Sequence, residues 1–158
     1  MKLKKVITNK TRDMKILKAI TVLILGVFLS SMSTIKTNDH TGVAFEKGNW
    51  ESVLKKAQAE DKLVFLDVYA SWCGPCKMLK AKTFPDSNVG EFFNQNFVNY
   101  AVDAEKGEGV KLAKKYNVRG YPTLLFINGD GEVVSRTAGY HSPDELIEVG
   151  KKIVNENR

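Results

Sequence analysis

The sequence predicts an α/β fold in which helices flank both faces of a central mixed β-sheet. Two short runs, 63–70 and 123–127, are almost wholly apolar, which is typical of strands buried on both faces. Segments with apolar residues at helical spacing alternate with these runs. Such alternation gives a sheet with parallel members, and a hairpin near the end of the chain adds antiparallel strands.

The first half of this fold is predicted from residue 50 onward. Apolar residues at positions 50, 53, 54 and 57 form one helical face, and Asn49 can cap that helix at its N-terminus. The strand 63–70 follows, with Asp67 as a charged residue in the middle of a buried run. A helical stretch over 76–83 ends at the break around Pro85, before a second helix rich in phenylalanine.

The second half continues as a strand, a short helix and a second strand, over 97–103, 110–116 and 123–127. The Asn-Gly-Asp-Gly sequence at 128–131 is a strong hairpin signal, so residues 132–138 are expected to return as a paired antiparallel strand. The last helix starts with Ser142 as N-cap and Glu145 three residues later, which is the pattern of a capping box.

The N-terminal segment has the features of a targeting sequence. Lysines precede an uncharged apolar run from Ala19 to Leu29, and small residues follow up to Ser33. We expect residues 1–33 to be a signal peptide or, if uncleaved, a membrane anchor near the lower length limit for a span. Residues 34–44 are predicted to be a polar linker, and 45–158 the folded domain. The protein is then exported, either periplasmic or membrane-anchored facing outside the cytoplasm.

The net charge of +6 comes from this leader. Residues 1–33 hold seven of the 24 basic residues and one of the 18 acidic residues, so the rest of the chain carries 17 of each. Nucleic-acid binding needs a basic face on the folded domain, and this balance does not supply one. The sequence therefore predicts no nucleic-acid partner, and contact with a membrane only through the leader.

The two cysteines, Cys73 and Cys76, form a C-x-x-C motif between the buried strand and the helical stretch. A cysteine at a helix N-terminus lies near unpaired N–H groups and the positive end of the helix dipole, which favour its thiolate. We expect Cys73 to attack a substrate disulfide and Cys76, one turn later, to resolve the mixed disulfide. The redox-active disulfide would then replace any separate cofactor.

Other uses of the motif fit less well. Zinc needs further ligands, but there is no second cysteine pair, and His40 and His141 are distant in sequence. A c-type haem needs histidine directly after the second cysteine, where Lys77 stands. The sequence therefore predicts no metal site, while an inert structural disulfide stays open as an alternative.

Several spaced motifs resemble the thioredoxin superfamily over roughly residues 45–156. The segment Trp72-Cys73-Gly74-Pro75-Cys76-Lys77 matches the thioredoxin active site, and Asp67 matches the family's buried aspartate. The segment Gly120-Tyr121-Pro122-Thr123 matches the stretch with the cis-proline, and Gly139 matches the family's late glycine. The resemblance implies a thioredoxin fold and thiol–disulfide oxidoreductase activity.

The resemblance also implies roles for the matched residues. The carboxyl of Asp67 would shuttle a proton from the second cysteine, since burial raises the pKa of an isolated carboxylate. The backbone at Tyr121, before a cis Pro122, would pair with substrate in β fashion. The remaining substrate-docking surface would come from Trp72, Gly74, Pro75 and Gly139. Purely structural roles stay open for Asp67, Pro122 and Trp72.

Three departures from ordinary thioredoxins are visible. Asn99 stands where the family usually has a lysine near the buried aspartate. Ala81 replaces the proline that kinks the active-site helix, so the break is expected at Pro85. Tyr121 is larger than the usual aliphatic residue before the proline. The stretch 83–89 is more similar to the C-terminal domain of transmembrane thiol reductases than to cytoplasmic thioredoxin.

The Gly74-Pro75 pair between the cysteines predicts the redox direction. Oxidising relatives place a histidine there, which stabilises the thiolate, whereas Gly-Pro brings no cation. The main hypothesis is an extracytoplasmic protein-disulfide reductase that acts on cysteine-containing proteins and receives electrons from a membrane thiol reductase. A disulfide oxidase or isomerase, and a non-catalytic binding module, remain alternatives.

Overall fold

The computed structural model describes residues 42–157, which form a four-stranded sheet in the order β2-β1-β3-β4. The strands are β1 (Leu63–Tyr69), β2 (Phe97–Asp103), β3 (Thr123–Ile127) and β4 (Val133–Ala138). β1 pairs in parallel with β2, while β3 pairs antiparallel with both β1 and β4. The mixed sheet predicted from the sequence is therefore confirmed.

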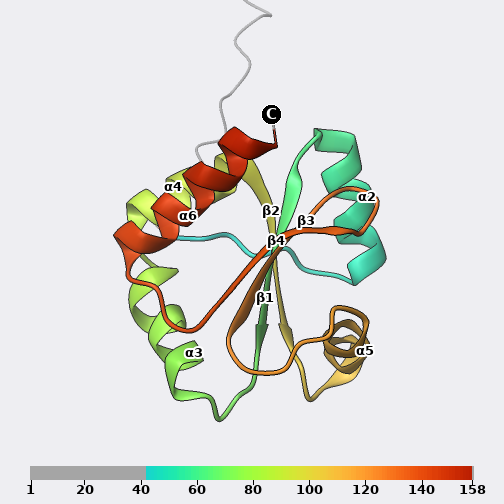
Figure 1. Ribbon diagram of the computed structural model, residues 1–158, viewed down its shortest axis with the longest axis vertical. Coiled ribbons are helices and arrows are strands. Elements are labelled where there is room, and N and C mark those ends of the chain that lie inside the picture. The colour runs from blue at the N-terminus through green and yellow to red at the C-terminus, as the bar shows by residue number, and fades with distance from the viewer. Residues whose placement is uncertain (1–41, 158) are drawn as a thin grey trace, which may run out of the picture. The chain divides into compact units, whose positions relative to one another are not determined.

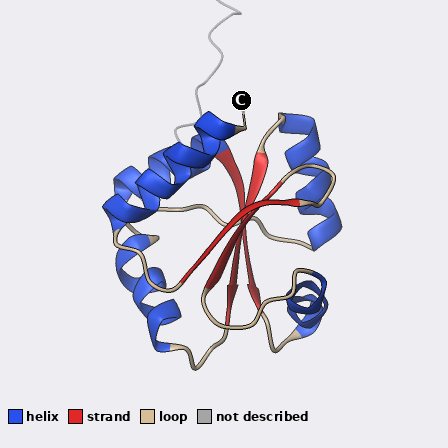
Figure 2. Ribbon diagram, viewed as in Figure 1, coloured by secondary structure: helices blue, strands red, loops and turns tan. Residues whose placement is uncertain are grey.

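Helices cover both faces of this sheet, as predicted. They are α2 (Trp50–Glu60), α3 (Gly74–Met78), the π-helix η1 (Leu79–Thr83), α4 (Ser87–Asn96), α5 (Gly107–Lys115) and α6 (Pro143–Glu156). In Figure 1, α3, α4 and α6 lie on one side of the sheet, and α2 and α5 lie on the other. Figure 2 shows the strands almost edge-on between the two sets of helices.

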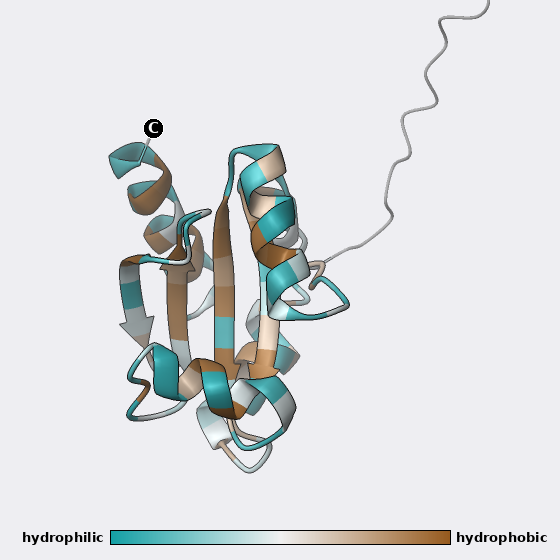
Figure 3. Cartoon of the chain, turned by 90° about the vertical axis from the view of Figure 1, so that its right-hand side faces the viewer, coloured by the Kyte–Doolittle hydropathy of each residue, from teal (hydrophilic) through white to brown (hydrophobic). Residues whose placement is uncertain are grey.

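The alternation of side chains along the strands divides the core into two layers. Leu66 of β1 packs in the layer that includes residues of α2 and α5, while Phe65 packs in the layer of α4 and α6. The second layer is aromatic, since the Phe65 ring lies 4.8 Å from Phe93 and 5.3 Å from Phe126. Figure 3 shows apolar strands next to helices with hydrophilic outer faces. Because Asp67 is two residues after Phe65, its carboxyl points into the aromatic side of the sheet.

The helix ends follow local capping signals. The Asn49 side chain accepts the N–H of Ser52 at 2.9 Å, and Ser142 forms the predicted capping box with Glu145. The helix α5 begins at Gly107, earlier than the predicted 110, because its first turn holds no apolar periodic residue. Its Glu108 carboxylate accepts the N–H of Trp50 at 3.0 Å, which caps α2 from another element.

Residues 42–46 pack against the domain beside β2. The N–H of Val43 donates to the carbonyl of Phe84 at 2.7 Å, and Phe45 forms a parallel bridge with Asn99. Residues 42–44, which the sequence assigned to the linker, are thus part of the packed structure. The expected signal peptide or anchor over 1–33 lies outside the described residues. Within 42–157, no helix combines the length and apolar character needed to cross a membrane.

A close approach between α4 and this segment gives a stability prediction. A Cβ added at Gly90 would lie 2.5 Å from the backbone carbon of Gly42, which is closer than real Cβ contacts. We expect Gly90→Ala to push residues 42–46 off the domain and to lower the free energy of unfolding by about 1–3 kcal/mol. Chemical denaturation measures the change. The control Gln95→Ala, on the exposed side of the same helix, should alter it by less than about 0.5 kcal/mol.

Candidate active site

Cys73 and Cys76 lie at the junction between β1 and α3, joined by a disulfide with an S–S distance of 2.05 Å. Cys73 is the N-cap of α3, and its Sγ accepts the backbone N–H of Cys76 at 3.1 Å. Pro75 fits the first turn of the helix, where no N–H bond is lost. Both cysteines are buried, but a Cβ added at Gly74 would meet nothing within 4 Å, so the residue between them borders open space.

The helix after the cysteines changes its hydrogen-bond pattern where the sequence lacks the family's proline. The N–H of Phe84 donates to the carbonyl of Leu79 at 2.9 Å, a bond across five residues. Leu79 to Thr83 therefore form a π-helix, a rare element that is frequently located at functional sites. The Thr83 hydroxyl donates to the carbonyl of His141 at 2.6 Å and ties this turn to the segment before α6.

Asp67 and Cys76 line the same groove, which has a volume of about 730 Å³. The Asp67 side chain is 5% exposed, and its Oδ1 has no hydrogen-bond partner among the described residues. Burial raises the pKa of this carboxyl to about 7. At neutral pH the group is therefore divided between its acid and its carboxylate form.

Asn99 does not take the place of the missing lysine at Asp67. Its amide donates to Asn94 Oδ1 at 3.1 Å and to the Ala44 carbonyl at 3.4 Å. The Asn94 oxygen also accepts the N–H of Ala44 at 2.8 Å. Asn99 thus helps to hold residues 42–46, and among the described residues it makes no hydrogen bond to Asp67. The lysines that line the groove of Asp67 are Lys77, Lys80 and Lys106.

The segment Tyr121-Pro122 lies against the cysteines. The peptide bond between these two residues is cis, as the resemblance implies, and the Tyr121 side chain packs on the cluster of Ala70, Cys73 and Cys76. Among residues 42–157, neither the N–H nor the C=O of Tyr121 has a backbone hydrogen-bond partner. Both groups are therefore available to an added strand.

Gly139 completes this segment from β4. Its N–H donates to the carbonyl of Pro122 at 3.0 Å, and its φ of +87° is in the region that glycine tolerates best. Its backbone thereby holds the loop that carries the cis bond. The structure thus brings together the cysteines with Asp67 on one side and with Tyr121 on the other.

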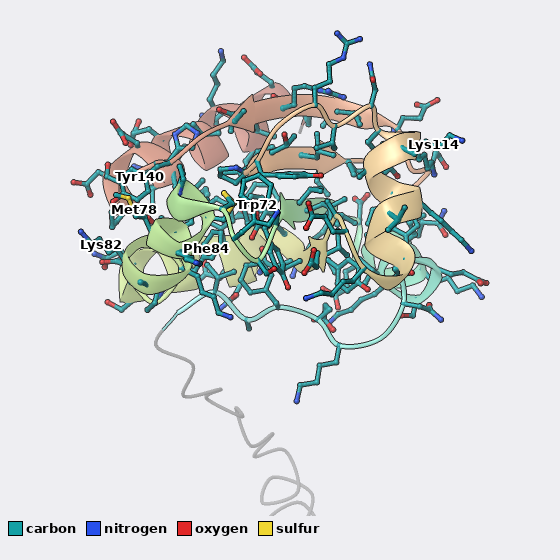
Figure 4. All side chains as sticks on the ribbon, turned by 90° about the horizontal axis from the view of Figure 1, so that it is seen from below. Trp72, Met78, Lys82, Phe84, Lys114 and Tyr140 are labelled. Atoms are coloured by element: carbon teal, nitrogen blue, oxygen red, sulfur yellow. A yellow bond between two sulfur atoms is a disulfide. The ribbon has the colours of Figure 1, made fainter. Side chains whose placement is uncertain are left out.

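Trp72 lies directly before the disulfide and is 63% exposed, which is unusual for a residue of this size. Its ring packs edge-to-face on Tyr121 with centroids 6.0 Å apart. Its Nε1 donates to both carboxylate oxygens of Glu105, each at 3.0 Å. Figure 4 views this end of the domain, with Trp72 near the centre and Met78 and Tyr140 to one side.

The sequence reasoning missed Glu105. The signal was available, because Glu105 follows the carboxyl end of β2 just as the cysteines follow the carboxyl end of the parallel strand β1. Residues after neighbouring parallel strands meet at one edge of the sheet. The π-helix and the groove beside residues 42–46 were missed for a different reason, since both depend on tertiary packing.

Metal binding has no basis in the described residues. Within 42–157, no three side chains of histidine, cysteine, aspartate or glutamate lie close enough together to hold a metal ion. The reactive groups that the site offers are the two sulfur atoms of the disulfide and the buried Asp67 carboxyl.

Comparison with known proteins places this geometry in a family. The family model described as a thioredoxin-like domain matches residues 50–153, more than half of the chain. The chain belongs to the thioredoxin-like domain family. The predicted thioredoxin fold and the suspected resemblance to this superfamily are confirmed.

Three relatives are particularly informative. The thiol:disulfide interchange protein DsbD of Campylobacter jejuni is 30% identical over 150 residues, which cover 84% of this chain and 26% of that protein. A solution structure from Bacteroides thetaiotaomicron, provisionally assigned as a disulphide-isomerase, is 50% identical with a TM-score of 0.63 and covers 75% of this chain and 97% of that one. The oxidised C-terminal domain of Neisseria meningitidis DsbD is 28% identical with a TM-score of 0.55, covering 68% and 91%.

These relatives define the general class of the chain. It is a thioredoxin-fold, disulfide oxidoreductase-like protein with a C-x-x-C disulfide, and its likeness extends to the C-terminal domain of DsbD. The chain spans about a quarter of the length of the Campylobacter relative.

The buried carboxyl gives the first prediction for the site. The pKa of Asp67 is about 7 in the folded chain against 3.8 as the ordinary value, so the native state binds more protons between these pH values. Stability must then fall as pH rises from about 4 to about 7 and stay reduced above that. We expect Asp67→Asn to remove this loss and to raise the free energy of unfolding at pH 8 by up to about 4 kcal/mol.

Urea denaturation of the oxidised protein at pH 4 and pH 8 measures this effect. The two proteins should differ much less at pH 4, where the native carboxyl is protonated. An equal difference between the two proteins at both pH values would show that burial does not raise the pKa of the Asp67 carboxyl.

The contact between Trp72 and Glu105 gives a second prediction. In Glu105→Ala the indole N–H loses its acceptor, and we expect its hydrogen exchange to become about fivefold faster, as suits a hydrogen bond of about 1 kcal/mol. Glu105→Gln keeps an oxygen acceptor and should exchange close to the wild-type rate. Nuclear magnetic resonance of the indole Nε1–H reports both, and unchanged exchange in Glu105→Ala would contradict the contact.

Proposed function

We propose that this protein is an extracytoplasmic protein-disulfide reductase. The observation that carries the proposal is a disulfide at a helix N-terminus, next to a segment whose free backbone groups can pair with a substrate strand. On its other side lies a buried carboxyl with a pKa of about 7. This arrangement suits exchange of a disulfide between two proteins.

In the first step, Cys73 acts as the nucleophile. In the reduced enzyme, the backbone N–H of Cys76 and the N-terminus of α3 stabilise the Cys73 thiolate. The thiolate attacks one sulfur of a substrate disulfide, a mixed disulfide forms, and the other substrate sulfur leaves as a thiolate. The free backbone of Tyr121 holds the substrate segment extended during this attack.

In the second step, Cys76 resolves the mixed disulfide. The Asp67 carboxylate takes the proton of the Cys76 thiol, directly or through water in the groove that both residues line. The Cys76 thiolate then attacks Cys73, the enzyme disulfide forms, and the second substrate sulfur leaves as a thiolate. In sum, the substrate disulfide gains two electrons and the enzyme dithiol loses them.

The surroundings of the cysteines support the reducing direction. The pair Gly74-Pro75 places no cation between the two sulfur atoms, so the thiolate of the reduced enzyme gains no extra stabilisation there. Strong oxidants of this fold owe their high potential to a stabilised reduced form. A weakly stabilised thiolate makes the dithiol the better electron donor.

Export and the electron donor are further parts of the proposal. The basic and apolar leader over 1–33 supports export from the cytoplasm. Disulfides persist in such a compartment, so a reductase there needs an outside source of electrons. A membrane thiol reductase is the donor we propose, and cysteine-containing proteins are the substrates. The likeness to DsbD supports this assignment.

A disulfide isomerase is the second candidate. It is favoured by the Bacteroides relative at 50% identity, which is provisionally assigned as a disulphide-isomerase. Recovery of activity by a protein with scrambled disulfides, at a rate that exceeds simple reduction, would favour this candidate over a reductase.

The reduction of insulin disulfides tests the proposal directly. With dithiothreitol as electron source, the wild-type protein should accelerate insulin precipitation, and Cys73→Ser should reduce the rate to that of dithiothreitol alone. The expected loss is complete because the nucleophile is removed. Equal rates for the wild type and Cys73→Ser would contradict the proposal and favour a non-catalytic binding module.

Replacement of the other cysteine provides the matched control. Cys76→Ser keeps the nucleophile but removes the resolving thiol, so it should hold substrates as mixed disulfides on Cys73. Mass spectrometry of the adducts identifies these substrates. Adducts should be absent from Cys73→Ser, which has the same number of cysteines.

A further inference from the structure

A second hollow lies beside the cis bond, outside the groove of Asp67. Its volume is about 660 Å³, and Tyr121, Pro122 and Gly139 form part of its wall. Tyr121 therefore belongs both to this hollow and to the segment proposed to pair with a substrate strand. A strand paired in that way would run beside the hollow, with the residues next to its reacting cysteine close to the side chains of the wall.

The charged side chains in the wall are Arg119 and Arg136, and no carboxylate of residues 42–157 lines the hollow. Arg119 is exposed and forms no ion pair among the described residues. Arg136 is also exposed, and its Nη2 donates to the carbonyl of Tyr116 at 3.0 Å. Its other donors remain available, and an arginine fork suits carboxylates in particular.

This charge is local. The chain after residue 33 carries equal numbers of basic and acidic residues, so a uniform positive field does not explain it. The nearby acidic residue Glu105 accepts a hydrogen bond from the Trp72 indole and is not part of the wall of the hollow. Two cations with no carboxylate partner in the described part of the chain, beside the segment proposed to bind substrate, form a surface complementary to an acidic peptide.

We propose that Arg119 and Arg136 select substrates that carry aspartate or glutamate beside the reacting cysteine. This inference rests on the proposed function and specifies its substrate class. The acidic side chains enter the hollow while the substrate backbone pairs with Tyr121. The pairing gives affinity for any extended segment, and the two guanidinium groups give preference for negatively charged ones.

The test compares three peptides with the same disulfide ring, flanked by aspartates, serines or lysines. For the wild type, kcat/KM should be about three- to tenfold higher for the aspartate peptide than for the serine peptide, and lowest for the lysine peptide. The preference should shrink at 1 M salt, where the Debye length falls to about 3 Å. Equal kcat/KM for the aspartate and serine peptides would overturn the inference.

Variants locate the preference. Arg119→Gln should reduce the aspartate-to-serine ratio about threefold, and Arg119→Lys should restore most of it if charge is the cause. Lys152→Gln removes one positive charge from an exposed position on α6 and should leave the ratio unchanged. A ratio that Arg119→Gln and Lys152→Gln alter equally would show that net charge, and not the hollow, sets the preference.

A binding experiment separates this inference from the proposed function. In peptides whose cysteines are replaced by serine, no disulfide exchange occurs, and the indole Nε1–H resonance of Trp72 reports binding beside Tyr121 in nuclear magnetic resonance. Tighter binding of the aspartate peptide supports the preference for acidic segments even if insulin reduction fails. Equal binding of the three serine-substituted peptides contradicts that preference even if insulin reduction succeeds.

Discussion

The backbone N–H of Cys76 donates to the Sγ of Cys73, and this contact at the start of α3 sets the geometry of the whole site. It exists because β1 ends one short turn earlier and Pro75 lies in the first turn of the helix, where no hydrogen bond is lost. In the proposed mechanism, the sulfur that caps the helix is the one that develops negative charge in the reduced enzyme. The same turn presents Trp72 to solvent, where Glu105 and Tyr121 hold its ring.

The Asp67 carboxyl is the destabilising group in this arrangement. A carboxyl with an unpartnered Oδ1 in an aromatic layer destabilises the native state at neutral pH. A pKa of about 7 suits proton transfer near physiological pH, as the proposed role of Asp67 as proton acceptor for Cys76 requires. Residues 42–46, held by Asn94 and Asn99, form part of the groove that connects this carboxyl to solvent.

Most of the fold follows from local signals in the sequence. The apolar run of β1, the Asn-Gly-Asp-Gly turn and the capping box of Ser142 each have a strong local cause, and the structure confirms all three. The C-x-x-C motif before a helix predicts the redox pair by itself, and the resemblance to a family adds the expected roles of Asp67 and Pro122. What the sequence did not reveal depends on contacts between distant residues: the bond from Trp72 to Glu105 and the role of Asn99 in holding residues 42–44. The π-helix was also missed, because it too depends on tertiary packing.

The reduction potential of the Cys73–Cys76 pair tests the central claim most directly. Equilibration of the purified protein with dithiothreitol buffers, followed by thiol alkylation, gives this value. A thiolate stabilised by the helix N-terminus alone predicts a potential near that of thioredoxin, about −270 mV. A potential above about −180 mV, the range of protein disulfide isomerase, would contradict a reductase and assign the protein to disulfide formation or isomerisation.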